Sequence, residues 1–456
     1  MPKGNDGGQV SGTPITGRTA GEIAASVRAH VDSGTLAPGA PLPPVRHLAE
    51  VLGVNRNTVV SAYRQLVQAG VAQTRGRAGT TVAERRESAE EGFARDTVLR
   101  DVGHGNPAPR LLPDLAAGLA AASRPPTLYG EPVIDPELAE WATRWLAVDQ
   151  PRDFRLTVTH GAVDAVERLL AQALTQGDAV ALEDPCFLAS IHTVRLAGYR
   201  TVPVPIDDEG MTVVGLRAAL RAGVRAIVCT PRAHNPTGTS LSAARAAALR
   251  AVLAEHPYVL VIEDDHFSRL ATTGYHSIIG PGQERWALVR SVSKFLGPDL
   301  RLAFVASDPG TGGRLAARIS PGTTWVSHLL QRLARTLLLD PEAGRQVASA
   351  AAHYAERNAA FVAALAEHGV GARAGDGLNV WVDVQDEATR VARRLMQRGW
   401  LARSGDDFGL VAGGRAARHL RLTVHDLDED GAAALVADVA AAVAAADTPH
   451  PPERTP

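Results

Sequence analysis

Cysteine is scarce in this chain of 456 residues, because only Cys186 and Cys229 occur. Two cysteines give no disulfide framework and no support for a structural zinc site, and they fit a reducing cytoplasm. The chain also lacks any run of about 20 apolar residues, so we expect no transmembrane helix. Its first residues, MPKGNDGGQVSGT, contain no apolar segment. We therefore expect no secretory signal and a cytoplasmic protein.

Length, composition and charge indicate a folded protein with more than one domain. Hydrophobic residues make up 45% of the chain and charged residues 21%, as in ordinary globular proteins, and 456 residues are too many for one core. Residues 1–82 carry eight lysines and arginines against four acids, a net charge of +4, and the remainder carries 39 against 45, a net charge of −6. A basic head on an acidic body is typical of a DNA-binding module joined to an enzyme-like domain, although chance can produce the same offset.

Three short helical patterns occupy the head. Gly53 separates the second pattern from the third, as the tight turn of a helix-turn-helix requires. The glycine-broken segment GVAQTRGRAGTTVAE that follows predicts a β-hairpin, so the head is expected to be a winged helix-turn-helix. The residues at helical spacing are Ile23, Val27 and Val31, then Val45, Leu48, Ala49 and Leu52, then Val59, Tyr63 and Leu66.

The start of the third helix is the predicted contact surface for double-stranded DNA. Asn55 can cap this helix, and the apolar stripe begins only at Val59, so the first turn is polar and exposed. Arginine pairs with guanine and asparagine with adenine in the major groove, whereas arginines on the second helix and in the hairpin can hold phosphates. The predicted DNA-binding residues are Arg46, Asn55, Arg56, Asn57, Thr58, Arg75 and Arg77.

The segment SGTLAPGAPLPPVRHLAEVLGVNRNTVVSAYRQLVQAGVAQTRGRAGTTV resembles the GntR family of bacterial repressors. The family pattern GxLxPGxxLPxxRxLA, then LGVxRxTVxxAYxxL, then GxGTxV is matched almost throughout. The resemblance implies that Arg46, Arg56, Asn57 and Thr58 contact DNA. Pro44 departs from the family, which usually has a small hydroxyl residue there that contacts phosphate or caps the helix. The alternative is a winged helix that is used only for protein contacts.

From about Asp101 onward, strand-like apolar runs alternate with longer helical stretches rich in alanine and leucine. This alternation predicts a mostly parallel sheet covered by helices. The clearest runs are DAVALED (178–184), VRAIVCTP (224–231), YVLVIEDD (258–265) and WALVRSVS (286–293).

The strongest chemical signal is the segment SVSKFLGPDLR, which follows one of these runs. Lys294 is flanked there by the hydroxyls of Ser291 and Ser293 and by Arg301, which suits a Schiff base with an aldehyde beside a phosphate. A single lysine is usually a solvated surface residue. The apolar flanks favour burial instead, and burial lowers the pKa of a lysine toward reactivity.

Three further segments fit a ligand that carries an aldehyde, a pyridine ring and a phosphate. Asp264 ends a strand-like run, and its carboxylate can pair with a protonated pyridine nitrogen, although a helix cap is the alternative. Asn235, in the turn HNPTG, can donate a hydrogen bond to a pyridine 3-oxygen. The backbone amides of Gly161, Ala162 and Val163 open a predicted helix and form a site for phosphate.

Residues 101–446 resemble the fold-type I enzymes that use pyridoxal 5'-phosphate, the aspartate aminotransferase superfamily. The matching pieces include GAVD, EDPCF, NPTG, EDD and SVSK. The resemblance implies a large three-layer α/β domain, a small C-terminal α+β subdomain, a pyridoxal phosphate cofactor, and a homodimer with active sites at its interface.

The same resemblance implies a role for each cofactor residue. Lys294 forms the Schiff base, Asp264 faces the pyridine nitrogen, Asn235 contacts the 3-oxygen, and Phe187 stacks on the ring. The phosphate is held by the hydroxyls of Ser291 and Ser293, by Arg301, and by Tyr129 of the partner subunit. The predicted cofactor-binding residues are Tyr129, Gly161, Ala162, Val163, Phe187, Asn235, Asp264, His266, Ser291, Ser293, Lys294 and Arg301.

Three positions bear on the catalytic role and the effector. His266 and Phe267 stand where the family usually has a tyrosine bonded to the 3-oxygen, so either His266 takes this role or Asn235 acts alone. Ala189 stands where relatives that bind amino-acid effectors often have an arginine. Arg421 matches the carboxylate-binding arginine of the small subdomain, and a surface salt bridge is its alternative role.

Head and body together resemble the MocR-type regulators, and stretches such as EDPCFLASIH and SVSKFLGPDLRLAFVASD are most similar to the PtsJ branch, which implies a role in vitamin B6 supply. We expect a transcriptional regulator that binds pyridoxal phosphate and responds to a small-molecule effector, a B6 vitamer or an amino acid, with weak or no transaminase activity. The alternatives are a working aminotransferase with a DNA-binding head, an amino-acid-responsive regulator, and a regulator that loads no cofactor and senses a protein. The expected parts are a disordered tail (1–18), the head (19–82), a linker (83–100), the body (101–446) and a second disordered tail (447–456).

Overall fold

The computed structural model describes residues 15–69, 71–74, 79–82, 91–94, 97–123 and 126–445. The chain forms two compact units, a head within the first 89 residues and a body made by most of the chain that follows. The tail predicted for 447–456 and the wing arginines Arg75 and Arg77 lie outside the described residues. In these described ranges, none of the helices is long and apolar enough to cross a membrane.

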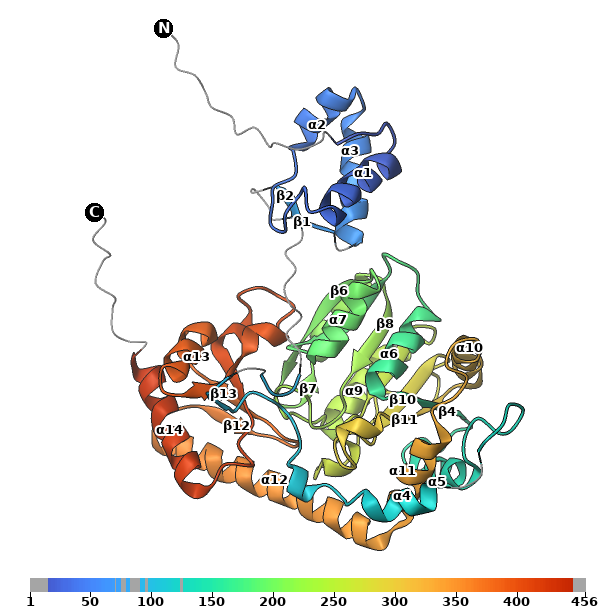
Figure 1. Ribbon diagram of the computed structural model, residues 1–456, viewed down its shortest axis with the longest axis vertical. Coiled ribbons are helices and arrows are strands. Elements are labelled where there is room, and N and C mark those ends of the chain that lie inside the picture. The colour runs from blue at the N-terminus through green and yellow to red at the C-terminus, as the bar shows by residue number, and fades with distance from the viewer. Residues whose placement is uncertain are drawn as a thin grey trace. The chain divides into compact units, whose positions relative to one another are not determined.

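The head, drawn in blue in Figure 1, has the predicted three helices and hairpin. The apolar residues Ile23, Val27, Val59 and Leu66 are fully buried in a common core, which confirms the helical patterns. The hairpin strands are antiparallel. The elements are α1 (Ala20–Asp32), α2 (Val45–Leu52), α3 (Arg56–Gln68), β1 (Ala72–Thr74) and β2 (Thr80–Val82).

Local signals in the sequence set the ends of the head's helices. Gly53 ends α2 in the left-handed conformation, with φ +63°, which a glycine adopts without strain. Pro44 precedes α2 and offers no side-chain cap, and the Tyr63 hydroxyl donates instead to the carbonyl oxygen of Pro43 at 2.7 Å. Ile15 packs against the core of the head, so the disordered tail predicted for 1–18 does not reach residue 18.

The body is built on a mixed, mostly parallel sheet in the strand order β4-β11-β10-β9-β8-β5-β6-β7. Neighbouring strands from β10 through β6 are parallel, whereas β11 is antiparallel to both of its neighbours and β7 is antiparallel to β6. The strands are β4 (Arg155–Thr159), β5 (Ala179–Asp184), β6 (Arg200–Asp207), β7 (Gly210–Met211), β8 (Val224–Cys229), β9 (Leu260–Asp264), β10 (Trp286–Ser291) and β11 (Ala303–Ser307).

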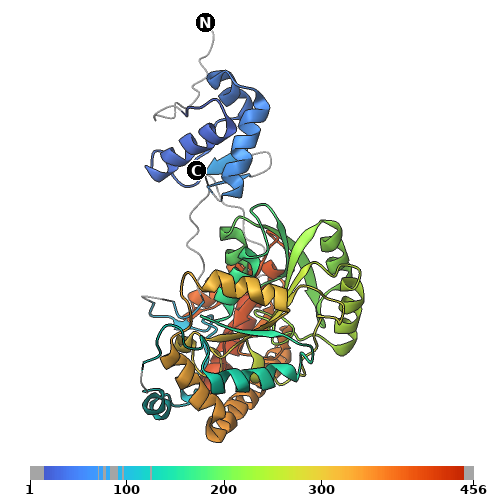
Figure 2. The same cartoon turned by 90° about the vertical axis from the view of Figure 1, so that its right-hand side faces the viewer.

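Helices cover both faces of this sheet, as the two views in Figures 1 and 2 show. Every residue of β9, β10 and β11 is buried, and because successive side chains point to opposite faces, both faces must be covered. The helices of the body before its C-terminal subdomain are α4 (Ala116–Ala122), α5 (Pro136–Ala147), α6 (Ala162–Ala171), α7 (Leu188–Leu196), α8 (Val213–Arg221), α9 (Ala243–Leu253), α10 (Pro309–Ile319), α11 (His328–Leu339) and α12 (Pro341–Glu367). Short 3₁₀ turns occur at Pro109–Leu111, Ser268–Leu270, Pro298–Leu300, Gly405–Phe408 and Arg415–Arg418.

A smaller antiparallel sheet and two helices form a C-terminal subdomain, orange to red in Figure 1. Helix α12 links the two parts, because Tyr354 on it packs into the core of the large sheet and Phe361 into the core of the subdomain. The subdomain's elements are β12 (Ala372–Ala374), β13 (Val380–Asp383), α13 (Ala388–Met396), β15 (Arg403–Ser404), β16 (His419–Leu422) and α14 (Glu429–Ala444).

The body begins earlier in the sequence than expected. The strand β3 (Arg100–Asp101) pairs in parallel with β14 (Trp400–Leu401), which belongs to the subdomain. Ahead of it, the Gly92 amide donates to the His104 carbonyl oxygen at 3.0 Å. The part of the predicted 83–100 linker from Glu91 onward that the structure describes is thus attached to the body.

Candidate functional site

The exposed first turn of α3 is formed as the sequence predicts. The Asn55 side chain accepts a hydrogen bond from the Asn57 amide at 2.8 Å and caps the helix. Arg56 and Asn57 are exposed, Thr58 is half-buried, and Arg46 is exposed on α2. These side chains are therefore available to a ligand of the head.

The candidate site of the body lies at the carboxyl ends of parallel strands. Thr159 ends β4, Asp264 ends β9 and Ser291 ends β10, and β4, β9 and β10 run in the same direction. The turn that holds Asn235 follows β8. Ligand sites of open α/β sheets lie at this edge, so the topology brings together segments that are far apart in the sequence.

Lys294 is a partly buried lysine in the segment after β10. Its Nζ donates to the carbonyl oxygen of Gly105 at 3.0 Å and lies 5.9 Å from the centre of the Phe267 ring. Burial lowers the pKa of Lys294, the nearby Arg421 lowers it too, and Glu91 opposes the shift. A lysine with a lowered pKa has more of the unprotonated amine that reacts with an aldehyde.

A group of buried polar and aromatic side chains lies at the end of β9. Asp264 is buried and its Oδ1 has no hydrogen-bond partner among the described residues. Its Oδ2 is 3.5 Å from His266 Nδ1, and neither ring nitrogen of His266 makes a hydrogen bond there. The half-buried Phe187 stacks on His266 with ring centres 5.5 Å apart. Buried polar atoms normally have partners, so this group fits a ligand that carries a ring and a protonated nitrogen.

The N-terminus of α6 is where the sequence predicts a phosphate site. Gly161 precedes the helix with φ +92°, and no side chain caps the helix. The guanidinium of Arg301 lies beside it, because a Cβ added to Gly161 would be 3.5 Å from Arg301 Cζ. Arg301 is exposed and makes no hydrogen bond or ion pair within the described chain. Free amides at a helix start beside an arginine suit a phosphate.

The two hydroxyls predicted to bind the same phosphate lie at the end of β10 and two residues after it. Ser291 is buried, and its Oγ accepts a hydrogen bond from the Ser293 amide at 3.1 Å. Ser293 is half-buried. The residues present thus fit the aldehyde, ring and phosphate of the predicted cofactor.

Arg421 is fully buried at the base of the same site, so its alternative role as a surface salt bridge is wrong. Its Nη1 lies 2.7 Å from Glu91 Oε1 and 3.0 Å from Asn235 Oδ1, and its Nη2 donates to the Gly103 carbonyl oxygen at 2.6 Å. The Asn235 amide nitrogen donates to the same Glu91 oxygen at 3.2 Å. Asn235 therefore bonds Arg421 and Glu91 in this structure.

Glu91 is the site residue that the sequence analysis missed. Burial alone would raise its pKa, but the charges of Arg421 and Lys294 and the hydrogen bond from Arg421 outweigh burial and lower it. Glu91 therefore lies beside two basic side chains that lower its pKa. It lies in a polar stretch whose composition predicts a linker, and no local sequence pattern distinguishes it as a site residue.

Two other predicted positions lie on the surface of the body. Tyr129 is 89% exposed, with its ring 5.4 Å from the ring of Trp325. Ala189 lies on α7, two residues after Phe187, and is half-buried.

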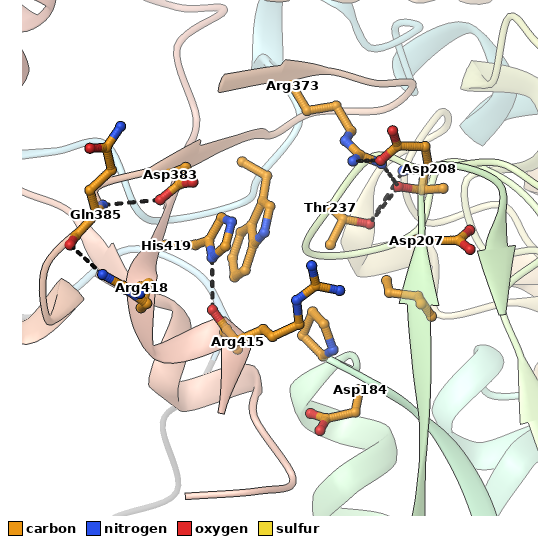
Figure 3. Close-up of a pocket in the computed structure, with 15 residues that line it drawn as sticks. Asp184, Asp207, Asp208, Thr237, Arg373, Asp383, Gln385, Arg415, Arg418 and His419 are labelled. Atoms are coloured by element: carbon orange, nitrogen blue, oxygen red, sulfur yellow. Dashed lines mark hydrogen bonds and ion pairs between the residues drawn. The ribbon is translucent and has the colours of Figure 1, made fainter. Parts of the chain in front are cut away.

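A pocket of about 540 Å³ lies between the large sheet and the C-terminal subdomain (Figure 3). Arg373 pairs with Asp208 on one side, and Arg415 extends into the pocket from the other. The lining includes Thr237 and the strand-end residues Asp184 and Asp207, but none of Lys294, Asp264 and Arg421. Across the described ranges, no three His, Cys, Asp or Glu side chains are grouped to hold a metal ion.

Comparisons with known proteins agree with this geometry. Residues 19–82 match the bacterial regulatory proteins of the gntR family, and residues 98–437 match aminotransferase class I and II. The vitamin B6 salvage pathway transcriptional repressor PtsJ of Salmonella typhimurium is 46% identical over 426 residues, which cover 93% of this chain and 98% of PtsJ. The chain belongs to the MocR-type GntR regulators.

One further regulator is similar to part of the chain, and two solved aminotransferases share the fold of its body. The pyridoxine biosynthesis transcriptional regulator PdxR of Corynebacterium glutamicum is 30% identical over 56% of this chain and 57% of PdxR. The kynurenine aminotransferase of Pyrococcus horikoshii, solved as a crystal structure, has a TM-score of 0.70 at 21% identity, covering 80% of this chain and 97% of that one. The α-aminoadipate aminotransferase LysN of Thermus thermophilus has a TM-score of 0.67 at 24% identity, covering 76% and 93%.

The MocR-type regulator thus joins a GntR DNA-binding head to an aminotransferase-like body, and its family implies a pyridoxal phosphate cofactor. The predicted family, fold class and cofactor are confirmed.

Proposed function

We propose that this MocR-type regulator changes its affinity for an operator when pyridoxal phosphate binds in the body, and that it controls genes of vitamin B6 supply. The observation that carries the proposal is the site that combines Lys294, with its lowered pKa, with Asp264 Oδ1 and the His266 ring nitrogens, which have no hydrogen-bond partner among the described residues. The B6 functions in the names of PtsJ and PdxR support the choice of target genes.

The cofactor supplies an aldehyde for a Schiff base and a ring that withdraws electrons. Lys294 is the amine that binds it, and Asp264 holds a proton at the ring nitrogen. Phe187 lies against the ring. His266 would donate to the 3-oxygen in this proposal, which its two ring nitrogens without hydrogen-bond partners support. Asn235 would provide a second donor if its bond to Glu91 is released.

The phosphate lies at the start of α6 in this proposal. The backbone amides of Gly161, Ala162 and Val163 would bind it, and no side chain caps the helix and competes for these amides. Arg301 provides the positive charge, and Ser291 and Ser293 provide hydroxyl donors.

In the head, the first turn of α3 reads bases in this proposal. Arg56, Asn57 and Thr58 contact the major groove, with Asn55 holding the turn in shape. Arg46 on α2 contacts phosphate. Arg75 and Arg77, which lie outside the described residues, are further phosphate contacts by analogy with the family.

We further propose that the regulator is a homodimer and that Tyr129 reaches the phosphate of the partner subunit. The segment around Tyr129 exposes apolar side chains that a monomer would normally bury: Leu128 is 64%, Tyr129 89% and Val133 51% exposed. Sedimentation equilibrium should therefore give twice the chain mass, and a stable monomer in solution would contradict this part of the proposal.

A working aminotransferase is the second candidate, because Lys294 and Arg421 are both present in one site. The pairing of Arg421 with Glu91 opposes it, because a substrate carboxylate must compete with Glu91 for the same guanidinium. Turnover of amino acids at about 1–1000 per second would favour the enzyme.

The test is a titration of labelled DNA from upstream of the regulator's own gene. Coupling between two sites typically changes affinity by about 5- to 150-fold. Cofactor-free and cofactor-loaded protein should differ within that range without any amino acid. If the two forms bind alike and an amino acid alone shifts the affinity, the effector is that amino acid and the vitamer proposal is wrong.

A further inference from the structure

Glu91 is held in the site by its own segment as well as by Arg421. Beside it, the Gly92 amide donates to the His104 carbonyl oxygen, and the Phe93 ring stacks on His104 with ring centres 4.3 Å apart. The Ala94 amide donates to Asp101 Oδ2 at 2.8 Å. The Glu91–Ala94 segment is therefore docked against the body at successive points, and its glutamate points into the site.

The contacts of Glu91 are those that a bound ligand's carboxylate would make. Its Oε1 takes hydrogen bonds from both Arg421 and Asn235. Its Oε2 is buried without a partner and lies beside the backbone of Gly105, to which Lys294 is bonded. The carboxylate of the chain thus occupies the space between the reactive lysine and the buried arginine.

We infer that Glu91 is a built-in occupant of the carboxylate-binding position at Arg421, so that the site takes a carbonyl ligand without a carboxylate and excludes α-amino acids. This inference rests on the proposed cofactor site and deepens it by naming the class of ligand. A ligand with a carboxylate binds only when it displaces Glu91 and with it the Glu91–Ala94 segment.

The physical reason is that the single positive charge of Arg421 is already paired with Glu91, although Arg421 Nε has no hydrogen-bond partner among the described residues. A buried guanidinium needs an anion, and Glu91 supplies it from within the chain. An attached competitor acts at an effective concentration in the millimolar range when its tether is short. A free carboxylate must exceed that concentration before it can displace Glu91 and bind Arg421.

Displacement of Glu91 would also affect the part of the chain that joins the head to the body. Glu91 lies in the chain between Val82, where the hairpin of the head ends, and Arg100, where the first strand of the body begins. Release of the Glu91–Ala94 segment would detach from the body a part of the chain that joins it to the head. A carboxylate ligand would therefore act on the connection, whereas a carboxylate-free vitamer would leave it docked.

The first test compares L-alanine with ethylamine, which differ by one carboxylate. Each is titrated into cofactor-loaded protein, and its apparent Kd is read from the absorbance of the bound cofactor. The wild type should bind alanine no more tightly than ethylamine. In Glu91→Gln, the affinity for alanine should increase on the order of tenfold or more relative to that for ethylamine, because the competing anion is gone. Glu367→Gln removes the same charge from an exposed position at the end of α12 and should behave as wild type.

The second test needs neither cofactor nor a lysine reaction. Cofactor-free wild type and Glu91→Gln are melted with increasing propionate, with propionamide and sodium chloride as controls. Propionate should raise the Tm of Glu91→Gln and leave the wild type close to the chloride control. Wild-type protein that prefers alanine to ethylamine by more than tenfold overturns the inference without any variant. An operator response to the cofactor that persists in this case would leave the proposed function standing while the inference fails.

Discussion

Replacement of Arg421 by glutamine removes the cation that pairs with Glu91 inside the body. Arg421 is fully buried and bonded to Glu91, Asn235 and the Gly103 carbonyl oxygen, so the change removes the charged partner of Glu91 and leaves it only the hydrogen bond from Asn235. Loss of one partner from a buried ion pair typically costs about 3–5 kcal/mol. We expect the free energy of unfolding of the body to fall by that amount in Arg421→Gln.

The double variant separates this pairing from the other contacts of Arg421. Glu91→Gln together with Arg421→Gln should cost less than the sum of the two single changes by at least about 1 kcal/mol, since contacting residues couple. Arg390→Gln is the matched control, because Arg390 pairs with Glu387 at 2.9 Å on the surface. Exposed pairs contribute at most about 1 kcal/mol.

The assay is urea unfolding followed by tryptophan fluorescence. All six tryptophans lie after residue 100, so the signal reports the body and not the head. The slope of the transition should be unchanged, because the variants alter stability rather than the surface exposed. If Arg421→Gln costs no more than Arg390→Gln, or if the two changes are additive, Glu91 and Arg421 are not an energetic pair.

Three further predictions concern DNA binding by the head and cofactor binding and stability of the body. Arg56→Ala should weaken operator binding by about 1–3 kcal/mol more than non-specific binding, whereas Arg46→Ala should weaken both alike; equal losses for Arg56→Ala would place base readout elsewhere. Arg301→Ala should raise the Kd for pyridoxal phosphate at least tenfold (about 1.4 kcal/mol) and leave the Kd for pyridoxal, which lacks the phosphate, unchanged; equal effects on both vitamers would remove Arg301 from the phosphate site. Burial raises the pKa of Glu183 from 4.5 to about 8, so the native chain keeps a proton that the unfolded chain loses and stability falls as pH rises across this window. Glu183→Gln lacks this dependence, and its stability relative to wild type, measured by urea unfolding, should increase over that range; a constant difference would contradict the shift.

The sequence alone predicts the elements whose signals are local. Asn55 and Gly53 mark the ends of helices by their conformational preferences, and the structure has them at those ends. Lys294 and Asp264 follow apolar runs that could only be buried strands, which is why their shared location at one edge of the sheet was predictable. The antiparallel strand β11 was not, because an apolar run does not state its direction.

The pairing of Glu91 with Arg421 could not be read from the sequence. The two residues are 330 positions apart, and Glu91 lies in a charged stretch whose composition indicates a solvated linker. Its place in the site depends on the tertiary contacts of Gly92 and Phe93 with His104. Such contacts leave no periodic pattern, so only the fold reveals them.

The central claim is that pyridoxal phosphate at Lys294 changes the affinity of the head for DNA. The most direct measurement is the operator Kd of wild type and of Lys294→Ala, each prepared without cofactor and then titrated with pyridoxal phosphate. The wild type should shift by about 5- to 150-fold, and Lys294→Ala should show no shift at cofactor concentrations that saturate the wild type. An equal shift in both proteins, or no shift in either, would contradict the claim.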